Sequence, residues 1–245
     1  MPFITAEGPS PILSQLSAFF SSRQIDAFLV GGFVRDSLLS LPSRDVDIAL
    51  KGDALAVGRE LALQLKGVFV PLSERHSVAR LIVPDPEGVS WTVDLTSYSG
   101  TIEEYLARRD FSANALALPL AEWAAPEWPE AVIDPCNGRG DMARKHIRAL
   151  NPGVFQEDPG RLLRSVRLAA RLKFRLEPET AQLVRAEAHR MSLVAPERLR
   201  DEFLLVLASD GTRGQLETLD RLDLLCRLIP ELELTKGVTQ PRNHH

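Results

Sequence analysis

Two aspartates separated by one residue are the first candidates for chemistry in this chain. Asp45 and Asp47 flank Val46 in a run, Val46–Leu50, whose residue types favour a β-strand. Because side chains alternate between the two faces of a strand, both carboxylates should point to the same face. Carboxylates placed in this way can hold two Mg²⁺ ions that stabilise the attacking and leaving oxygens of phosphoryl transfer. A pair of this kind alone is more often a solvated strand edge or an ion pair, so its surroundings must decide.

A glycine pair before the aspartates suits a phosphate site. A strand is predicted over Ile25–Val30, Gly31 and Gly32 follow it, and a short helix is predicted over Val34–Leu41. Glycines let the backbone approach a ligand closely, and a helix N-terminus attracts phosphate through its free N–H groups and its dipole. Arg35, one turn into this helix, can add a charge-assisted contact to a triphosphate.

Further charged residues follow along the first half of the chain. Asp94 lies in a predicted strand, Trp91–Thr96, where it can supply a third carboxylate or merely cap the strand end, and both interpretations stay open. Arg109, the second of two adjacent arginines, can bind triphosphate oxygens. Asp110 can orient an arginine, and Asn114 can bond a ribose or the backbone.

A regular series of arginines occurs later in the chain. Asp158 is predicted to cap a helix over Pro159–Leu172, where proline suits the first turn. Arg161, Arg164 and Arg167 recur every three residues and therefore lie along one side of this helix. Such a stripe beside an apolar stripe is normally a solvated face, unless a ligand contacts it.

The character of the predicted elements changes near residue 150. Before it, short strands alternate with helices, and the further elements expected there are a helix at Ala54–Leu65 and strands at Val68–Pro71, Val78–Val83 and Trp91–Thr96. A turn at 84–88 joins the last two strands as a hairpin. After residue 150 we expect only helices, including Thr180–His189, Glu197–Leu207 and Thr212–Leu222. The fold class is therefore α+β, with a small mixed sheet followed by an all-helical module.

Taken together, these motifs resemble those of class II tRNA nucleotidyltransferases and bacterial poly(A) polymerases, members of the polymerase-β-like superfamily. The similarity is carried by LVGGFVRDSLL at 29–39, RDVDIAL at 44–50, RRDFSANA at 108–115 and EDPGRLLRSVR at 157–167. DPCNGRGD at 134–141 resembles a structural turn of the family, and PERLRDEF at 196–203 resembles a helix that packs behind the arginine helix. The chain departs from the family at Gly160, where leucine is frequent.

The resemblance implies a division of labour between two domains and a tail. A catalytic head would span residues 1–148 and a nucleotide-selecting helical neck and partial body 149–235, while 236–245 resembles the approach to a metal-dependent phosphohydrolase domain. In the neck, Asp158 and Arg161 would present an acceptor and a donor to the Watson–Crick edge of cytosine or adenine. Arg164 and Arg167 would support Arg161 or contact the nucleotide.

The function that the resemblance implies is the addition of CMP and AMP, from CTP and ATP, to the 3′ end of tRNA with Mg²⁺ as cofactor. The connection at 98–107 is short, which resembles enzymes that add only the two cytidines. Alternatives are a poly(A) polymerase, a nucleotidyltransferase that acts on a small molecule, and a non-catalytic RNA-binding module. The arginine helix disfavours the second, and the intact carboxylates disfavour the third.

Composition is compatible with this reading. The chain has 245 residues, of which 44% are hydrophobic and 25% charged, too apolar for disorder. A net charge of −4 gives no global attraction to RNA, so a local basic surface is needed. Two cysteines and the lack of a long apolar run predict a cytoplasmic protein without a membrane span. His244 and His245, native residues or the remnant of a tag, are assigned no metal.

Overall fold

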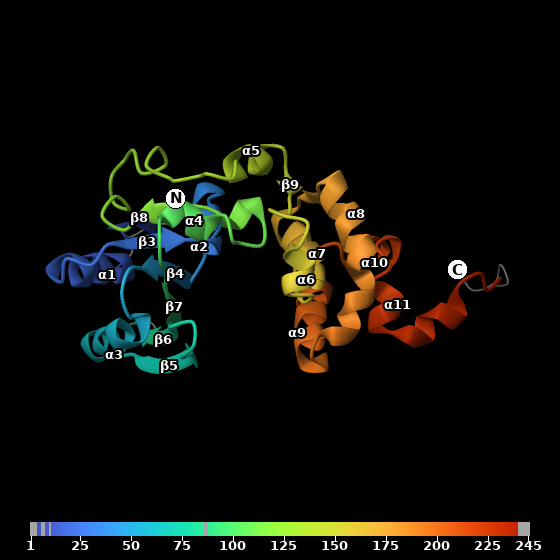
Figure 1. Ribbon diagram of the computed structural model, residues 1–245, viewed down its shortest axis with the longest axis horizontal. Coiled ribbons are helices and arrows are strands. Elements are labelled where there is room, and N and C mark those ends of the chain that lie inside the picture. The colour runs from blue at the N-terminus through green and yellow to red at the C-terminus, as the bar shows by residue number, and fades with distance from the viewer. Residues whose placement is uncertain (1–3, 6–7, 10, 86–87, 240–245) are drawn as a thin grey trace. The chain divides into compact units, whose positions relative to one another are not determined.

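The computed structural model describes residues 4–5, 8–9, 11–85 and 88–239, which form two compact units, residues 1–139 and 140–245. Figure 1 shows the strands of the sheet in the first unit and the helices that dominate the second. His244 and His245 lie outside the described residues. The functional boundary expected after residue 148 stays a prediction.

A six-stranded mixed sheet is the framework of the first unit. Its strands follow the order β5-β6-β7-β4-β3-β8. Their bounds are β3 Ala27–Val30, β4 Asp45–Leu50, β5 Val68–Ser73, β6 Val78–Pro84, β7 Ser90–Ser97 and β8 Ala117–Pro119. Only the β4–β7 pair is parallel among these strands, and the remaining neighbours are antiparallel. The predicted mixed sheet and the hairpin across 84–88 are therefore confirmed.

Helices complete the first unit, and local signals in the sequence fix their ends. Their bounds are α1 Pro11–Ser22, α2 Gly32–Leu38, α3 Ala54–Leu65, α4 Ile102–Leu106 and the 3-10 helix η1 Ser112–Asn114, and two short strands, β1 Ile4–Thr5 and β2 Gly8–Pro9, pair near the start. Asp53 begins α3 by accepting hydrogen bonds from the N–H groups of Leu55 and Ala56. Lys66 ends it in the left-handed conformation.

The core of the first unit lies between these helices and the sheet. Apolar residues at helical spacing bury one face of α1, and Phe19 and Phe20 are almost fully buried there. The helix α3 packs against β5, β6 and β7. Gly58 on α3 allows this close packing, because a Cβ atom there would lie 3.1 Å from the ring of Phe69 and from the Cβ of Ala79.

The second unit is built around α7, whose amphipathic pattern the sequence predicts. The helix α5 Gly138–Ala143 begins at the end of the first unit and continues into the second. The further elements are β9 His146–Ile147, α6 Val154–Glu157, α7 Arg161–Leu172, β10 Arg175–Leu176, α8 Pro178–Glu187, η2 Ala188–Leu193, α9 Pro196–Leu207, α10 Thr212–Arg221, α11 Leu225–Leu228 and η3 Pro230–Thr235. The apolar side of α7 is buried, as expected, and this helix packs against α9 and α10. Among the described residues, no helix is long and apolar enough to cross a membrane.

The expectation that the second unit is entirely helical is wrong in one detail. The two-residue strands β9 and β10 pair in parallel. Lys173 takes the left-handed conformation at the end of α7, and the chain then runs back so that Arg175 donates its N–H to the carbonyl of Lys145. This pairing depends on tertiary contact and is too short to produce the alternating pattern by which a strand is recognised.

A tight turn precedes α5 and fixes the path of the chain. The carboxylate of Asp134 accepts hydrogen bonds from the N–H groups of Gly138 and Arg139, at 2.7 and 2.9 Å. The backbone of Gly138 passes so close to Ser112 that a Cβ atom would lie 2.2 Å from the Ser112 carbonyl oxygen. A side chain at position 138 would collide with the backbone at the start of η1, so this turn requires glycine.

Replacing Gly138 by alanine should destabilise the first unit. Because the obstructing atom belongs to the backbone, the turn or η1 must move, at a cost of about 1–3 kcal/mol. Urea unfolding measures this as a lower free energy of unfolding. The control is Gly214→Ala on α10, where no atom lies within 4 Å, so alanine should be tolerated. Equal stability of both variants would show that the close approach does not constrain the fold.

Candidate active site

The two aspartates of β4 project from the face that the sequence predicts. Asp45 is exposed and Asp47 is half-buried, while Val46 between them is buried on the opposite face. In the parallel pairing of β4 with β7, Asp47 is the register partner of Asp94. Register partners on neighbouring strands point to the same face, so the sheet gathers three carboxylates on one side.

Asp94 already has a partner, which the sequence analysis missed. Arg80 on β6 is its register partner in the antiparallel hairpin and donates two hydrogen bonds of 2.8 Å to its two carboxylate oxygens. The hydrogen bonds to Asp94 are the main reason why the pKa of Arg80 lies above its usual value. Partial burial opposes this rise, and the negative charges of all three aspartates add to it. The hairpin places position 80 opposite position 94, so the pair could have been inferred from the sequence by aligning the two predicted strands.

The oxygen donors of these carboxylates have the chemistry that suits a divalent cation which takes some of its ligands from a substrate. Among the described residues, no group of three or more His, Cys, Asp or Glu side chains is arranged to hold a metal by itself. Arg80 takes two of the roughly four acceptor sites of Asp94, which leaves that carboxylate less capacity for a metal ion, and Asp45 and Asp47 lie on the same face of the sheet. Mg²⁺ is usually bound by one or two carboxylates together with substrate phosphates and water, so two hard oxygen donors at this place suit it.

The glycine pair lies directly beside the aspartates. Gly31 has a φ of 68°, and a Cβ atom there would lie 3.3 Å from Oδ2 of Asp47 and 3.5 Å from Nη2 of Arg109. At Gly32 a Cβ atom would lie 3.4 Å from Nη2 of Arg35 and 3.8 Å from Oδ2 of Asp47. The structure therefore brings Arg109 to the turn that also holds Gly31 and Asp47, although it lies more than 60 positions later in the sequence.

Arg109 is the basic group best suited to a phosphate. Its guanidinium lies over the ring of Tyr105, at 5.0 Å from the centroid. Its Nε is a buried donor that has no hydrogen-bond partner among the described residues. A buried donor without a partner is costly, and phosphate oxygens are the acceptors that a guanidinium binds most strongly. This donor supports the prediction that Arg109 binds the nucleotide.

Arg35, in contrast, belongs to a buried network that holds α2 to η1. Its Nε and Nη2 donate to Oδ1 of Asp36 at 2.8 and 2.7 Å, and its Nη1 donates to Oδ1 of Asn114. Asn114 in turn donates to Asp110, at 2.9 Å, and that carboxylate also accepts the N–H of Phe111. At most 8% of the surface of each of these polar residues is exposed, so they support the glycine turn from beneath. Direct contact of Arg35, Asp110 or Asn114 with a nucleotide stays a prediction.

In the second unit, the beginning of the arginine helix differs from the prediction. The helix α7 starts at Arg161, and Asp158 does not cap it. The preceding turn is tight: the N–H of Arg161 donates to the carbonyl of Asp158, three residues back, so regular helix begins only after it. The Asp158 side chain accepts the N–H of Gly160 instead, at 3.0 Å.

The three arginines of α7 lie on one partly exposed side of the helix. Arg161 donates to Glu157 and to the carbonyl of Val154, both at 3.1 Å. Arg167 forms an ion pair with Glu202 on α9, and Arg164 between them is half-buried. The guanidinium of Arg161 is therefore held through its Nη1 atom, while all three arginine side chains remain partly exposed.

Asp158 has a second partner that the sequence did not reveal. Arg198 on α9 donates to both of its carboxylate oxygens at 2.7 Å. Partial burial works against ionisation of Asp158, but the hydrogen bonds and the charge of Arg198 outweigh it, so the pKa of Asp158 lies below its usual value. Nothing in the local sequence around position 198 indicates this contact, because the two residues are 40 positions apart.

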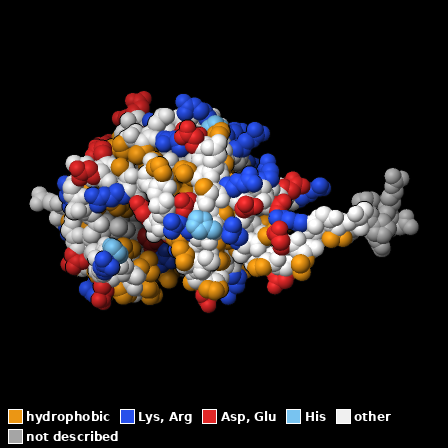
Figure 2. Space-filling view, turned by 45° about the vertical axis from the view of Figure 1, so that its right-hand side comes forward, with side chains coloured by type: hydrophobic (Ala, Val, Ile, Leu, Met, Phe, Trp, Pro, Cys, Tyr) orange, Lys and Arg blue, Asp and Glu red, His pale blue; other side chains and the backbone are white. Residues whose placement is uncertain are grey.

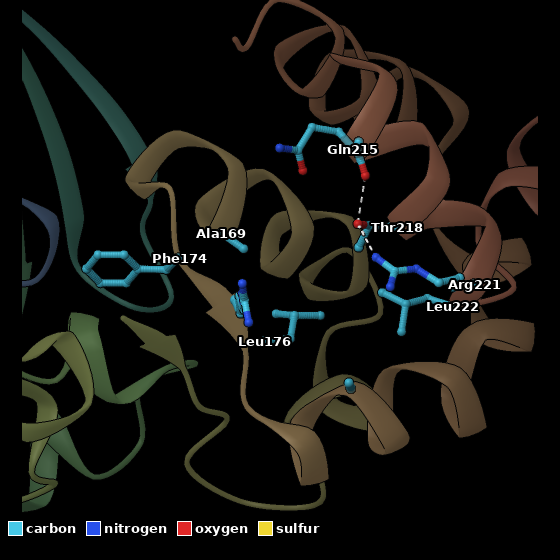
Figure 3. Close-up of a pocket in the computed structure, with 10 residues that line it drawn as sticks. Ala169, Phe174, Leu176, Gln215, Thr218, Arg221 and Leu222 are labelled. Atoms are coloured by element: carbon cyan, nitrogen blue, oxygen red, sulfur yellow. Dashed lines mark hydrogen bonds between the residues drawn. The ribbon is translucent and has the colours of Figure 1, made fainter. Parts of the chain in front are cut away.

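The second unit also contains a cavity that is lined by neither Asp158, Arg198 nor the three arginines of α7. It has a volume of about 600 Å³ and is lined by residues of α7, β10, α8 and α10, among them Leu176, Thr218 and Leu222 (Figure 3). Arg221 lines it and donates a hydrogen bond to the hydroxyl of Thr218. The cavity adjoins Gly214, which has no side chain to fill it. It contains no carboxylate, so we assign it no role in phosphoryl transfer.

The geometry of the carboxylates, the glycine turn and the arginine helix can be compared with known proteins, and the comparison gives the family. Residues 27–148 match the family described as Poly A polymerase head domain, and residues 173–235 match the one described as Probable RNA and SrmB- binding site of polymerase A. The chain belongs to the family of class II tRNA nucleotidyltransferases and poly(A) polymerases. The resemblance found in the sequence motifs is thus confirmed.

Three relatives illustrate the similarity. The CC-adding tRNA nucleotidyltransferase of Geobacter sulfurreducens is 32% identical over 93% of this chain and 55% of its own length. The A-adding enzyme of Deinococcus radiodurans is 36% identical over 89% of this chain and 48% of its own. The structure of the Thermotoga maritima CCA-adding enzyme complexed with tRNA has a TM-score of 0.78 at 28% identity, over 96% of this chain and 56% of that one. The chain therefore spans about half the length of the relatives it matches.

Replacing Asn114 by alanine should destabilise the first unit. The change removes the acceptor of Arg35 and a donor to Asp110, leaving buried charged groups short of a partner, at a cost of about 1–3 kcal/mol. The measurement is the free energy of unfolding in urea. Gln64→Ala, an exposed amide on α3, is the matched control and should change it by less than about 0.5 kcal/mol. If both variants unfolded alike, the network would not support the site.

Proposed function

We propose that the protein is a template-independent tRNA nucleotidyltransferase that transfers CMP or AMP from CTP or ATP to the 3′ end of tRNA. The observation that carries the proposal is the row of carboxylates on β4 and β7 beside Gly31 and the unpartnered donor of Arg109. This arrangement offers a metal site next to a phosphate site on one face of a sheet. The relatives named above as CC-adding and A-adding tRNA nucleotidyltransferases support tRNA as the substrate.

The reaction joins the 3′-oxygen of the RNA to the α-phosphorus of the nucleoside triphosphate and releases pyrophosphate. Asp45 and Asp47 would hold Mg²⁺, which, when bound, lowers the pKa of the hydroxyl and neutralises the leaving group. Arg109 would bind triphosphate oxygens, and the glycine pair would leave room for them. Arg80 would keep Asp94 fixed at the edge of this group, as its two hydrogen bonds indicate.

The residues of α7 and the turn before it would select the base. Cytosine and adenine both present an exocyclic amino group beside a ring nitrogen acceptor on their Watson–Crick edges. A carboxylate and a guanidinium, those of Asp158 and Arg161, are complementary to this pattern. Arg164 and Arg167 would support them along the same side of the helix.

Binding of tRNA would depend on local basic surface, since the net charge is −4. In Figure 2, basic and acidic side chains are interspersed on the visible face, and several Lys and Arg side chains lie next to one another along its upper part. Contacts of this kind bind phosphate without reading sequence, so the affinity should fall with salt. The cytoplasm, where tRNA is matured, is the location that this function implies.

For the product, we favour the addition of cytidines. After β7 the chain enters α4 directly, and α4 is closed by a capping box in which Thr101 and Glu104 bond each other's backbone N–H groups. An ordered helix therefore occupies the place where the family's CCA-adding members are expected to carry a flexible loop. A poly(A) polymerase is the second candidate, because the first matched family is described by that activity.

The product is tested with tRNA lacking CCA, tRNA ending in C and tRNA ending in CC, each supplied separately with CTP and with ATP. We expect extension by CTP of the first two and no extension of the third. Efficient use of ATP on the tRNA ending in CC would replace CC addition by A or CCA addition. Long products from ATP alone on an arbitrary RNA would identify a poly(A) polymerase.

Replacing Asp45 by alanine should abolish transfer while leaving the fold intact. Asp45 is exposed, so its removal has little structural cost, but the loss of a metal ligand should reduce incorporation of labelled CMP by more than about 100-fold. Asp26→Ala, another exposed carboxylate of the first unit, serves as the control and should keep full activity. Normal incorporation by the Asp45 variant would refute the metal assignment.

A further inference from the structure

The contact between Arg198 and Asp158 joins a helix of unassigned chemistry to a residue that would read the base. Nη1 and Nη2 of Arg198 donate to Oδ1 and Oδ2 of Asp158 in parallel, each at 2.7 Å. A two-pronged pair of this kind fixes the plane of the carboxylate as well as its position. The pair spans two elements, the turn before α7 and the first turn of α9.

Gly160 makes this contact possible. A Cβ atom at Gly160 would lie 2.5 Å from Cζ of Arg198, 2.7 Å from its Nη2 and 2.8 Å from its Nε. The guanidinium thus covers the place where any other residue would have a side chain. Gly160 has a φ of −60° and a ψ of −21°, a conformation open to every residue type, so a side chain here would be accepted by the backbone but would displace the guanidinium of Arg198.

The contact leaves Asp158 with limited capacity to accept further hydrogen bonds. A carboxylate offers about four acceptor sites, and Arg198 and the N–H of Gly160 occupy three of them. The remaining site is on Oδ2, which lies 3.8 Å from Nε of Arg161. That distance is too long for a hydrogen bond, so Arg198 holds Asp158 close to Arg161 without the two closing on each other.

We propose that Arg198, admitted by Gly160, is a positioning residue that sets base specificity. It would fix Asp158 as an acceptor for the amino group of cytosine or adenine and keep its ion pair with Arg161, at 3.8 Å, from closing to a direct hydrogen bond. This inference rests on the proposed function, in which those two residues read the base. Uracil carries a carbonyl oxygen in place of the amino group of cytosine, and a fixed carboxylate repels that oxygen, so the pair provides rejection as well as attraction.

Replacing Arg198 by methionine should lower the preference for CTP over UTP. Without Arg198, Asp158 is free to move to its nearest cation, Arg161, and the two would then satisfy each other instead of the base. We expect the ratio of kcat/KM for CTP to that for UTP to fall by about 10-fold or more. Arg198→Lys keeps the charge but not the two-pronged geometry, so its CTP to UTP ratio should lie between those of Arg198→Met and the wild type.

Gly160→Ala tests the same pair from the other side. The new Cβ must displace the end of a flexible side chain and not the backbone, and the helical conformation accepts alanine, so the protein should remain folded. We expect the same loss of preference for CTP. Since both changes break one interaction, the double variant should lose no more than the larger single effect.

Arg200→Met is the matched control on the same helix. Arg200 is exposed, and within the described part of the chain its ion pair is with the neighbouring Asp201, so its loss should leave the CTP to UTP ratio unchanged. Thermal unfolding of all variants monitors the fold. A general weakening of α9 would lower activity on both nucleotides and leave their ratio as it was.

The outcomes separate this inference from the proposed function. If the wild type transfers no nucleotide to tRNA, both fail together. If the wild type prefers CTP to UTP and neither Arg198→Met nor Gly160→Ala changes the preference, the function stands and the inference is wrong. Loss of preference in only one variant, or additive losses in the double variant, would also overturn it, because both substitutions remove the same contact.

Discussion

The parallel pairing of β4 with β7 is the constraint on which the first unit depends. It sets Asp47 opposite Asp94 and carries Asp45 on the same face. A shift of the register by one residue would turn these carboxylates to the other side of the sheet, into the buried core. The apolar residues of β4, of which Ile48, Ala49 and Leu50 are buried, hold that register, so packing in the core determines the chemistry on the open face.

The buried pair of Arg35 and Asp36 has a comparable role beneath the glycine turn. Both side chains are almost fully buried, and removing one partner of such a pair leaves an uncompensated charge in a medium of low polarity. Asn114 and Asp110 extend the pair to η1. The RD and RRDFSANA motifs therefore act through a shared support, which explains why residues that look like separate ligands in the sequence are packed together.

The sequence was sufficient for features that depend on local pattern and insufficient for those that depend on long-range contact. Alternation and helical spacing predicted the strands β3, β4, β5, β6 and β7, the hairpin, α3 and the buried side of α7, but not the three-residue edge strand β8. The pairing of Arg80 with Asp94 follows from the hairpin register and could have been found. The β9–β10 pairing and the contact of Arg198 with Asp158 could not, because no local signal links positions so far apart. Gly160 departs from the family's frequent leucine, and only the structure shows that the guanidinium of Arg198 occupies the place where a side chain would lie.

Arg80 with Asp94 and Arg198 with Asp158 show the same physical arrangement, one in each unit. In both, a partly exposed arginine donates to the two oxygens of one aspartate. Such a pair adds little stability near solvent, because the interaction is screened and two long side chains must be ordered. What it does provide is orientation: a carboxylate held in one plane presents its remaining lone pairs in fixed directions. Selection by a fixed protein surface, in the absence of a template strand, requires that orientation be set before the ligand arrives.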